Sequence, residues 1–362
     1  MTVENLLLAV FLGIPVTLGY LLFLFFRKQR QEKRASAPSL LAGNALVLSF
    51  LCAIVVFLGE IHYRFFFDST DSFGLTKANQ RWFERHFQEN ESGFRDTIEY
   101  LRRAPSGKRR VTFLGDSFTA AHGVANVEDR FANQIRAARP DWEVHVLASP
   151  GWDTEPELTV LKLYGNQGFQ VDVVVLVYCL NDISDIAPEW QEILHRVYEA
   201  MTPGFLARHS YFFNTLYYRW KASRNPEISN YYHSVMENYE GTVWDKQKLR
   251  LHAFRDLVDS QGGRLLVVTF PFVHNIGPDY EYRRVHARLD EAWRNLEVPH
   301  LDLLSVFEAY PDAELVVNRY DAHPNERAHA IAAKSIAAFI HEHLPNSPQP
   351  VIPTFRDKPP NP

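Results

Sequence analysis

The sequence predicts a three-layer α/β domain with a parallel five-stranded sheet, preceded by an N-terminal hairpin of two transmembrane helices. Two observations predict this organisation. Two uncharged apolar stretches lie before residue 60, and from Val111 onward short apolar runs alternate with amphipathic stretches of helical length. The chain has 362 residues and a formal net charge of −5. No nucleic-acid partner is expected, because such a partner needs a basic stripe.

The hairpin is predicted from the stretches Leu6–Phe26 and Leu40–Leu58. Each is long enough to cross a hydrocarbon core as a helix, and Pro15 inside the first is tolerated in such helices. The loop at 27–39 is basic, and its cations are Arg27, Lys28, Arg30, Lys33 and Arg34. The positive-inside rule places this loop in the cytoplasm and everything after about residue 60 outside. We therefore expect an integral protein of a bacterial inner membrane, with its main domain periplasmic or extracellular.

Two alternatives to this topology stay open. The first stretch could be a cleaved signal peptide, although its basic cluster follows the apolar run where a signal peptide carries it in front. One of the two stretches could instead lie in the membrane interface, which would reverse the topology.

The main domain is predicted to cover residues 110–344. Apolar runs predict its five strands at 111–115, 143–149, 171–178, 264–270 and 299–304. Near-continuous Val and Leu indicate burial on both faces, which is typical of a parallel sheet covered by helices. Residues 60–109 are interpreted as a connector that packs on this domain, with a short helix at Asn79–His86. The Pro-rich tail at 345–362 is expected to be extended or disordered.

The third and fourth predicted strands are separated by a segment too long for a single crossover. Residues 183–245 are helical in tendency and rich in Tyr and Phe. We consider three interpretations of this insertion. It could be an extra helical layer that completes the core, a lid or substrate platform at the strand ends, or an amphipathic surface resting on the bilayer.

Ser117 follows the first predicted strand directly, in the stretch VTFLGDSFTAAHGV. Serine is a favoured helix cap, so this position alone allows either a cap or a nucleophile. The carboxyl ends of parallel strands gather at one edge of a sheet, where ligands bind. Later segments deliver further polar groups to that edge, and these are Gly151, Asn181, Asp182, Asp321 and His323.

These groups suit nucleophilic catalysis. Ser117 could attack, with His323 as its base and Asp321 orienting the imidazole. An oxyanion could be held by the backbone N–H groups of Ser117 and Gly151 together with the side-chain amide of Asn181.

The same residues carry a family resemblance. GDSFT, the lone Gly151, LND and DAHPN resemble, in order, the four signature blocks of the SGNH (GDSL-type) hydrolase superfamily, over residues 110–342. The resemblance implies a flavodoxin-like sheet and a Ser-His-Asp hydrolase of esters. It implies the following roles: Ser117 as nucleophile and oxyanion donor, Gly151 and Asn181 as oxyanion donors, His323 as base, Asp321 as its partner, and Asp116 and Asp182 as supporting residues, with Asp116 shaping the turn.

Two positions depart from the family pattern. Cys179 stands where the third block usually has glycine, and one residue instead of two separates Asp321 from His323. A backbone carbonyl is therefore an alternative partner for the imidazole of His323. The upstream stretch NESGFRD, Asn90–Asp96, resembles a segment found ahead of such domains in membrane-attached members.

Three functions are compatible with these residues. The first is a serine esterase acting outside the cytoplasm on acyl esters of envelope glycans or lipids. The second is an O-acyltransferase that uses the same acyl-serine with a sugar acceptor, and the third is a non-catalytic binding module. The membrane and a membrane partner protein are further candidate partners.

No cofactor is expected, and no His/Cys/Asp cluster has metal-ligand spacing along the chain. The two cysteines, Cys52 and Cys179, do not form a disulfide framework. His122 either lines the cleft or is structural.

Overall fold

The computed structural model of the chain describes residues 2–31 and 36–344. Its residues divide into two compact units. Of the described residues, the helical unit contains those within 2–69, 74–81 and 200–224, and the sheet unit contains 70–73, 82–199 and 225–344. The predicted Pro-rich tail, and Lys33 and Arg34 of the predicted basic loop, lie outside the described residues.

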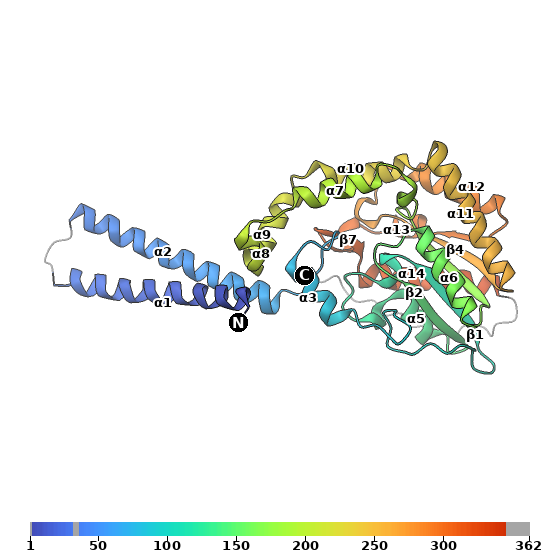
Figure 1. The fold of residues 1–362 in the computed structure, drawn as a ribbon, viewed down its shortest axis with the longest axis horizontal. Coiled ribbons are helices and arrows are strands. Elements are labelled where there is room, and N and C mark those ends of the chain that lie inside the picture. Colours follow the sequence, from blue (N-terminus) through green and yellow to red (C-terminus); the bar gives the residue numbers. More distant parts are fainter. Residues whose placement is uncertain (1, 32–35, 345–362) are drawn as a thin grey trace. The chain divides into compact units, whose positions relative to one another are not determined.

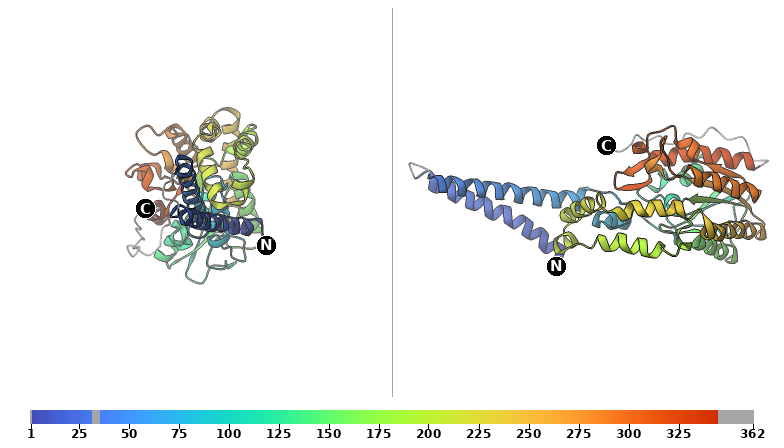
Figure 2. Two further views of the ribbon diagram at one scale, coloured as in Figure 1. Left: turned by 90° about the vertical axis from the view of Figure 1, so that its left-hand side faces the viewer. Right: turned by 90° about the horizontal axis from the view of Figure 1, so that it is seen from above.

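The helical unit is built on two long apolar helices, α1 (Val3–Gln29) and α2 (Ala37–Ile61), which pack against each other (Figures 1 and 2). Their most apolar windows have mean hydropathies of 2.4 and 2.5. By length and composition, both helices are able to cross a membrane. They contain the two stretches predicted to do so. The short helices α8 (Phe205–His209) and α9 (Tyr211–Ala222) belong to the same unit.

The sheet unit contains a five-stranded sheet in the order β2-β1-β3-β4-β5, and every neighbouring pair is parallel. This confirms the predicted fold class. The five strands are β1 (Arg109–Gly115), β2 (Trp142–Ala148), β3 (Val173–Cys179), β4 (Arg264–Phe270) and β5 (His300–Asp302). Four of the five predicted strands differ from these bounds by one or two residues at an end. β1, for example, begins with Arg109 and Arg110, which do not belong to the apolar run that predicted this strand.

The remaining helices form the two outer layers and the connections. Their bounds are α3 (Lys77–His86), α4 (Ser117–Ala120), α5 (Phe131–Ala138), α6 (Thr154–Asn166), α7 (Trp190–Ala200), α10 (Pro226–Glu237), α11 (Gly241–Ser260), α12 (Arg283–Asn295), α13 (Leu304–Phe307) and α14 (Glu326–His343). Right-handed crossovers place α5 on one face of the sheet and α6 and α11 on the other. α14 packs against α5, and α11 packs against α6 (Figure 1).

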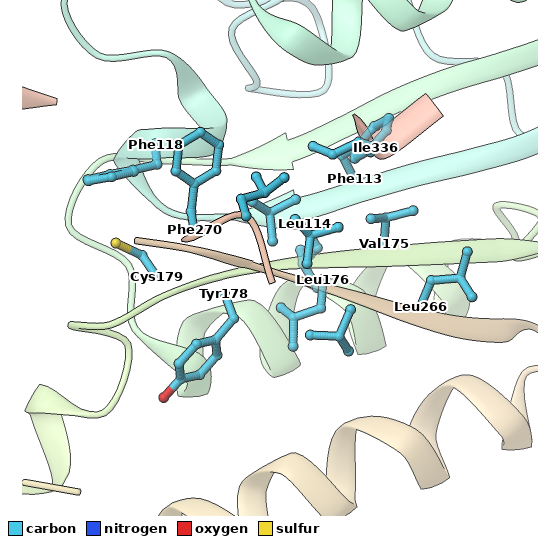
Figure 3. Packing of buried hydrophobic residues seen from close by; sticks show 14 of the residues in the cluster. Phe113, Leu114, Phe118, Val175, Leu176, Tyr178, Cys179, Leu266, Phe270 and Ile336 are labelled. Atoms are coloured by element: carbon cyan, nitrogen blue, oxygen red, sulfur yellow. The ribbon is translucent and has the colours of Figure 1, made fainter. Parts of the chain in front are cut away.

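The core lies on both faces of the central strands. Phe113, Val175 and Leu176 are fully buried, and Ile336 of α14 covers the side of Phe113 (Figure 3). Every residue of β3 is buried. This accounts for the near-continuous run of valines there, because neither face of that strand meets water. Tyr178, next along the strand, points to the opposite face from Cys179 (Figure 3).

A two-stranded hairpin, β6 (Val316–Asn318) and β7 (Asp321–Pro324), was not predicted from the sequence. Residues 70–73 lie along it: the Ser72 N–H donates to the Tyr320 carbonyl at 3.1 Å, and the Ala322 N–H donates to Ser72 Oγ at 2.8 Å. The predicted connector at 60–109 is therefore divided. Residues 60–69 and 74–81 belong to the helical unit, whereas 70–73 and the part from 82 onward belong to the sheet unit.

Candidate active site

Ser117 is the first residue of α4, directly after β1. The residue that caps this helix is Asp116, whose Oδ1 accepts a hydrogen bond from the Phe118 N–H at 2.9 Å. Because the neighbouring aspartate provides the cap, the hydroxyl of Ser117 is not needed to cap the helix. Ser117 Oγ lies 2.9 Å from Nε2 of His323 and, at the longer distance of 3.3 Å, from Asp116 Oδ2. Ser117 is nearly buried, with 9 % of its surface exposed.

The imidazole of His323 connects Ser117 to Asp321. Its Nδ1 lies 2.5 Å from Asp321 Oδ1, and that oxygen also accepts from the His323 backbone N–H at 3.1 Å. The one-residue separation of Asp321 and His323 has a simple structural basis. Both lie on β7, where side chains two positions apart point to the same side of the strand. The partner of the imidazole in this structure is thus the carboxylate and not a backbone carbonyl.

Burial and charge act in opposition on this pair. Burial alone would favour a neutral Asp321, but the charge of His323 and the hydrogen bonds from His323 and Thr70 hold the pKa of the Asp321 carboxyl well below its usual range. Burial likewise disfavours a charged His323, yet the charge and hydrogen bond of Asp321 outweigh it and raise the pKa of this imidazole. The carboxylate therefore stabilises an imidazolium at His323.

Thr70 satisfies the second oxygen of the Asp321 carboxylate. Its buried hydroxyl donates to Asp321 Oδ2 from a position 251 residues earlier in the chain. The backbone at Gly123 approaches Thr70 closely, which requires glycine. A Cβ at this position would lie 2.9 Å from Thr70 Oγ1, and its φ is +85°. Thr70 was not predicted from the sequence, since no local motif marks a lone hydroxyl so far from the predicted strands.

His122 stacks on one face of the His323 ring. The two rings stack with centroids 4.0 Å apart and planes 10° from parallel, and His122 Nε2 lies 3.5 Å from Asp321 Oδ2. Burial, and then the charge of His323, lower the pKa of His122 to about 3. His122 is thus a neutral flat surface that restricts the orientation of the His323 ring.

Three of these side chains could also hold a metal ion by position. The ligand atoms of His122, Asp321 and His323 lie within 4.8 Å of one another, a cluster that spacing along the chain did not predict. Both ring nitrogens of His323 already face protein partners, Ser117 and Asp321. A metal ion at this point would have to displace one of those hydrogen bonds. The donor set is organised as a proton-transfer chain and does not fit a resident metal.

Gly151 and Asn181 follow β2 and β3, the strands on either side of β1. Gly151 has φ +81°, and no atom lies within 4 Å of the position that a Cβ would take. The amide of Asn181 faces the Asp116 carboxyl group. The turn that carries Asn181 is fixed by Asp182, whose Oδ2 accepts from the Cys179 N–H at 2.8 Å. The fold thus brings the predicted oxyanion donors to the same edge as Ser117.

A buried carboxyl group lies beside this edge, on α6. Glu157 is fully buried, and neither of its carboxyl oxygens has a hydrogen-bond partner in the described structure. Burial, followed by the charges of Asp116 and Asp153, raises the pKa of Glu157 well above its ordinary value. The folded state therefore holds this proton more tightly than the unfolded chain does.

We expect Glu157→Gln to stabilise the protein in a pH-dependent way. The pKa of Glu157 is about 4.3 in the unfolded chain and higher in the folded protein. The protein therefore loses stability as the pH rises from the first of these values through the second. The amide does not ionise, so the variant escapes this loss. Its melting temperature should exceed that of wild type by about 2–4 °C at about pH 8, equivalent to about 1 kcal/mol, and match it near pH 4. Glu155→Gln, at an exposed position of the same helix, is the control; a lower melting temperature for Glu157→Gln at high pH would contradict the account.

Comparison with known proteins identifies the family. The sequence model of the GDSL-like Lipase/Acylhydrolase family matches residues 113–331, which is more than half of the chain. The chain belongs to the GDSL-like lipase/acylhydrolase family. As a GDSL-type protein it is a hydrolase of ester bonds. The match includes Ser117, Gly151, Asn181, Asp321 and His323. It begins at residue 113 and therefore does not include Thr70.

Several solved structures resemble this GDSL-type hydrolase at low sequence identity. A member of the lipolytic G-D-S-L family from Veillonella parvula is 13 % identical, with a TM-score of 0.40, covering 66 % of this chain and 100 % of that one. A lipase/acylhydrolase from Enterococcus faecalis is 13 % identical, with a TM-score of 0.39, covering 66 % and 99 %. A psychrotrophic esterase from Pseudoalteromonas is 13 % identical, with a TM-score of 0.40, covering 66 % and 100 %. No curated protein matches the sequence significantly.

Proposed function

We propose that this chain is a membrane-anchored serine esterase that acts outside the cytoplasm, through an acyl-Ser117 intermediate, on acyl esters of envelope glycans or lipids. The observation that carries the proposal is the connected chain from Ser117 Oγ through both nitrogens of His323 to Asp321. A hydroxyl, an imidazole and a carboxylate in this order are what nucleophilic acyl transfer requires.

In the first step, Ser117 Oγ attacks the acyl carbonyl carbon while its proton passes to His323 Nε2. Asp321 does not take that proton; it stabilises the imidazolium and fixes the tautomer that leaves Nε2 unprotonated beforehand. The negative charge that develops on the carbonyl oxygen is held by the N–H groups of Ser117 and Gly151 and by the Asn181 amide.

The second half of the reaction uses the same groups. The His323 imidazolium gives its proton to the departing alcohol oxygen, and the acyl group remains on Ser117. A water molecule then loses a proton to His323 and attacks the acyl carbon, which releases the acid and restores the Ser117 hydroxyl. A sugar hydroxyl entering in place of water would make the same enzyme an O-acyltransferase.

The membrane location is supported by α1 and α2, which are long and apolar enough to span a bilayer. The predicted orientation follows from the basic residues at the C-terminal end of α1, Arg27 and Lys28 in its last turn and Arg30 directly after it. An enzyme anchored in this way meets substrates that are part of the membrane or close to it, which favours envelope glycans and lipids over small soluble esters.

The test uses the purified full chain with a short-chain p-nitrophenyl ester, and with an O-acetylated oligosaccharide in the presence and absence of an unacylated one. Release of free acid from both donors supports the esterase. Acylated oligosaccharide as the main product would support the transferase. No turnover of any donor by a folded protein would overturn both proposals.

We also propose that Thr70 is a positioning residue for this reaction. Thr70→Val keeps the shape but leaves Asp321 Oδ2 without its donor, and a hydrogen bond to a charged group contributes about 1.5–3 kcal/mol. We expect kcat to fall about tenfold or more with little change in KM, and Thr70→Ser to restore most of the activity. Thr215→Val removes another buried threonine hydroxyl, which bonds the Tyr211 carbonyl, and should leave kcat unchanged. Equal activity in Thr70→Val and wild type would refute this role.

A further inference from the structure

The helices α8 and α9 lie at the end of the apolar hairpin opposite to the predicted cytoplasmic loop. Glu60, in the last turn of α2, is fully buried and receives three hydrogen bonds from the start of α9. Ser210 Oγ donates at 2.6 Å, the Tyr211 N–H at 3.2 Å and the Phe212 N–H at 3.0 Å. A carboxylate in this place satisfies free N–H groups at a helix N-terminus, so α9 begins where α2 ends.

α9 also reaches along the apolar part of the hairpin. The rings of Phe213 and Phe11 lie 6.0 Å apart between centroids, and Phe11 is buried. Phe11 is five residues inside the apolar stretch that begins at Leu6, a rise of about 8 Å along a helix. Gly59 of α2 has no room for a Cβ, because the ring of Phe212 occupies that space. The side chains of α9 therefore lie beside residues that would be in the outer part of a bilayer.

Large exposed apolar side chains lie on both α8 and α9. Phe205 and Leu206 of α8 are exposed, as are Leu216 and Trp220, which lie one helical turn apart on α9. The exposed fraction of Trp220 is 54 %. Large apolar side chains gathered on one face usually mark a contact surface.

The charge of this segment is opposite in sign to that of the whole chain. Residues 200–224 contain four Lys and Arg residues and no Asp or Glu, whereas the chain has a formal net charge of −5. The four cations are Arg208, Arg219, Lys221 and Arg224. Lys221 Nζ and the guanidinium carbon of Arg224 lie 5.7 and 5.5 Å from the centroid of the Trp220 ring. Trp beside Lys and Arg is the composition that favours the membrane interface.

We propose that α8 and α9 form an interfacial membrane element, embedded in the headgroup region of the non-cytoplasmic leaflet and in contact with anionic phospholipids. This inference rests on the proposed membrane anchor, because α9 is placed by its contacts with α1 and α2. Trp220, Leu216 and Phe205 enter the boundary between headgroups and acyl chains. Lys221 and Arg224 meet the lipid phosphates, because basic side chains are attracted to an anionic membrane surface.

The test places single nitroxide spin labels on the full chain in vesicles of phosphatidylcholine and phosphatidylglycerol. The labels are attached to Leu216→Cys and Trp220→Cys in a Cys52→Ala background, because Cys52 is exposed and the other native cysteine is buried. Leu249→Cys on α11 provides the matched control, since Leu249 is an apolar residue of the sheet unit with 71 % of its surface exposed. Leu48→Cys, at an exposed position on α2, reports on the anchor itself.

For each spin label, we would measure the rate of collision with oxygen, which concentrates in lipid, and with a water-soluble nickel chelate. Labels at 216 and 220 should show an oxygen-to-nickel ratio several-fold higher than the label at 249. Raising the phosphatidylglycerol content should raise their ratio further, and Lys221→Gln with Arg224→Gln should remove that dependence.

The other outcomes separate the two proposals. If the label at 48 lies in lipid while those at 216 and 220 match 249, the interfacial element is refuted and the anchor stands. If the label at 48 is also in water, the anchor itself fails. Lipid contact at 216 and 220 that does not depend on phosphatidylglycerol would refute the anionic selectivity.

Discussion

Replacing Ser117 by alanine is expected to abolish ester hydrolysis, with kcat/KM falling by several orders of magnitude. The physical reason is the loss of the proposed nucleophile: Ser117 Oγ lies 2.9 Å from Nε2 of His323, the proposed base. Loss of a serine nucleophile typically costs a factor of about 10⁴–10⁶ in kcat. Hydrolysis of a p-nitrophenyl ester, corrected for the rate in buffer, measures the effect.

Ser149→Ala is the matched control for this substitution. Ser149 follows β2 at the same edge of the sheet, and we assign it no part in the reaction. The control should keep nearly full activity. A Ser117→Ala variant that is folded, as judged by circular dichroism, and still turns over ester at a rate close to wild type would contradict the assignment.

Asp321→Asn is expected to lower the plateau of kcat/KM by about 10³–10⁴-fold. An amide in this place keeps the shape but cannot stabilise the His323 imidazolium, and it can hold the imidazole in the wrong tautomer. The predicted partner is the carboxylate at 2.5 Å from Nδ1.

The pH dependence of this variant distinguishes electrostatics from a loss of structure. His323 acts as a base only when neutral, so kcat/KM falls as the pH drops through the His323 pKa of the free enzyme. Burial lowers that pKa, and Asp321 raises it above the ordinary 6.5. Without the carboxylate, burial prevails and the acidic limb of the profile should move to lower pH.

Asp302→Asn is the control for the loss of a partly buried Asp–His pair. Asp302 Oδ1 lies 2.9 Å from His286 Nδ1, a pair outside the proposed site. This variant should leave the position of the acidic limb unchanged. An acidic limb that stays in place in Asp321→Asn would contradict the role of Asp321.

The fold was predictable because its signal is local. Burial on both faces of β1, β3 and β4 makes each strand a mostly apolar run, and this pattern located the sheet. The polar residues after those strands were predictable for the same reason, since parallel strands end at one edge. The strand ends were less certain, because residues such as Arg110 are buried with polar partners and do not look apolar.

Other parts of the site depend on contacts between distant segments, which no local pattern contains. Thr70 meets Asp321 only because residues 70–73 lie along a short hairpin that was itself not predicted. His122 was weighed as a structural or cleft residue, and its stacking on His323 depends on the αL turn at Ala121 after α4. Residues 200–224 belong to the helical unit, where they contact the buried Glu60. The sequence does not signal these contacts, because nothing marks a charged residue at a helix end as buried.

The most direct test of the central claim is the site of covalent modification by a fluorophosphonate. The phosphonyl group is attacked as an ester carbonyl would be, so it marks the serine that His323 activates. We expect one adduct per chain, located by peptide mass spectrometry on Ser117, lost in Ser117→Ala and strongly slowed in His323→Ala. An adduct on a different serine, or no adduct in a preparation that hydrolyses esters, would contradict the central claim.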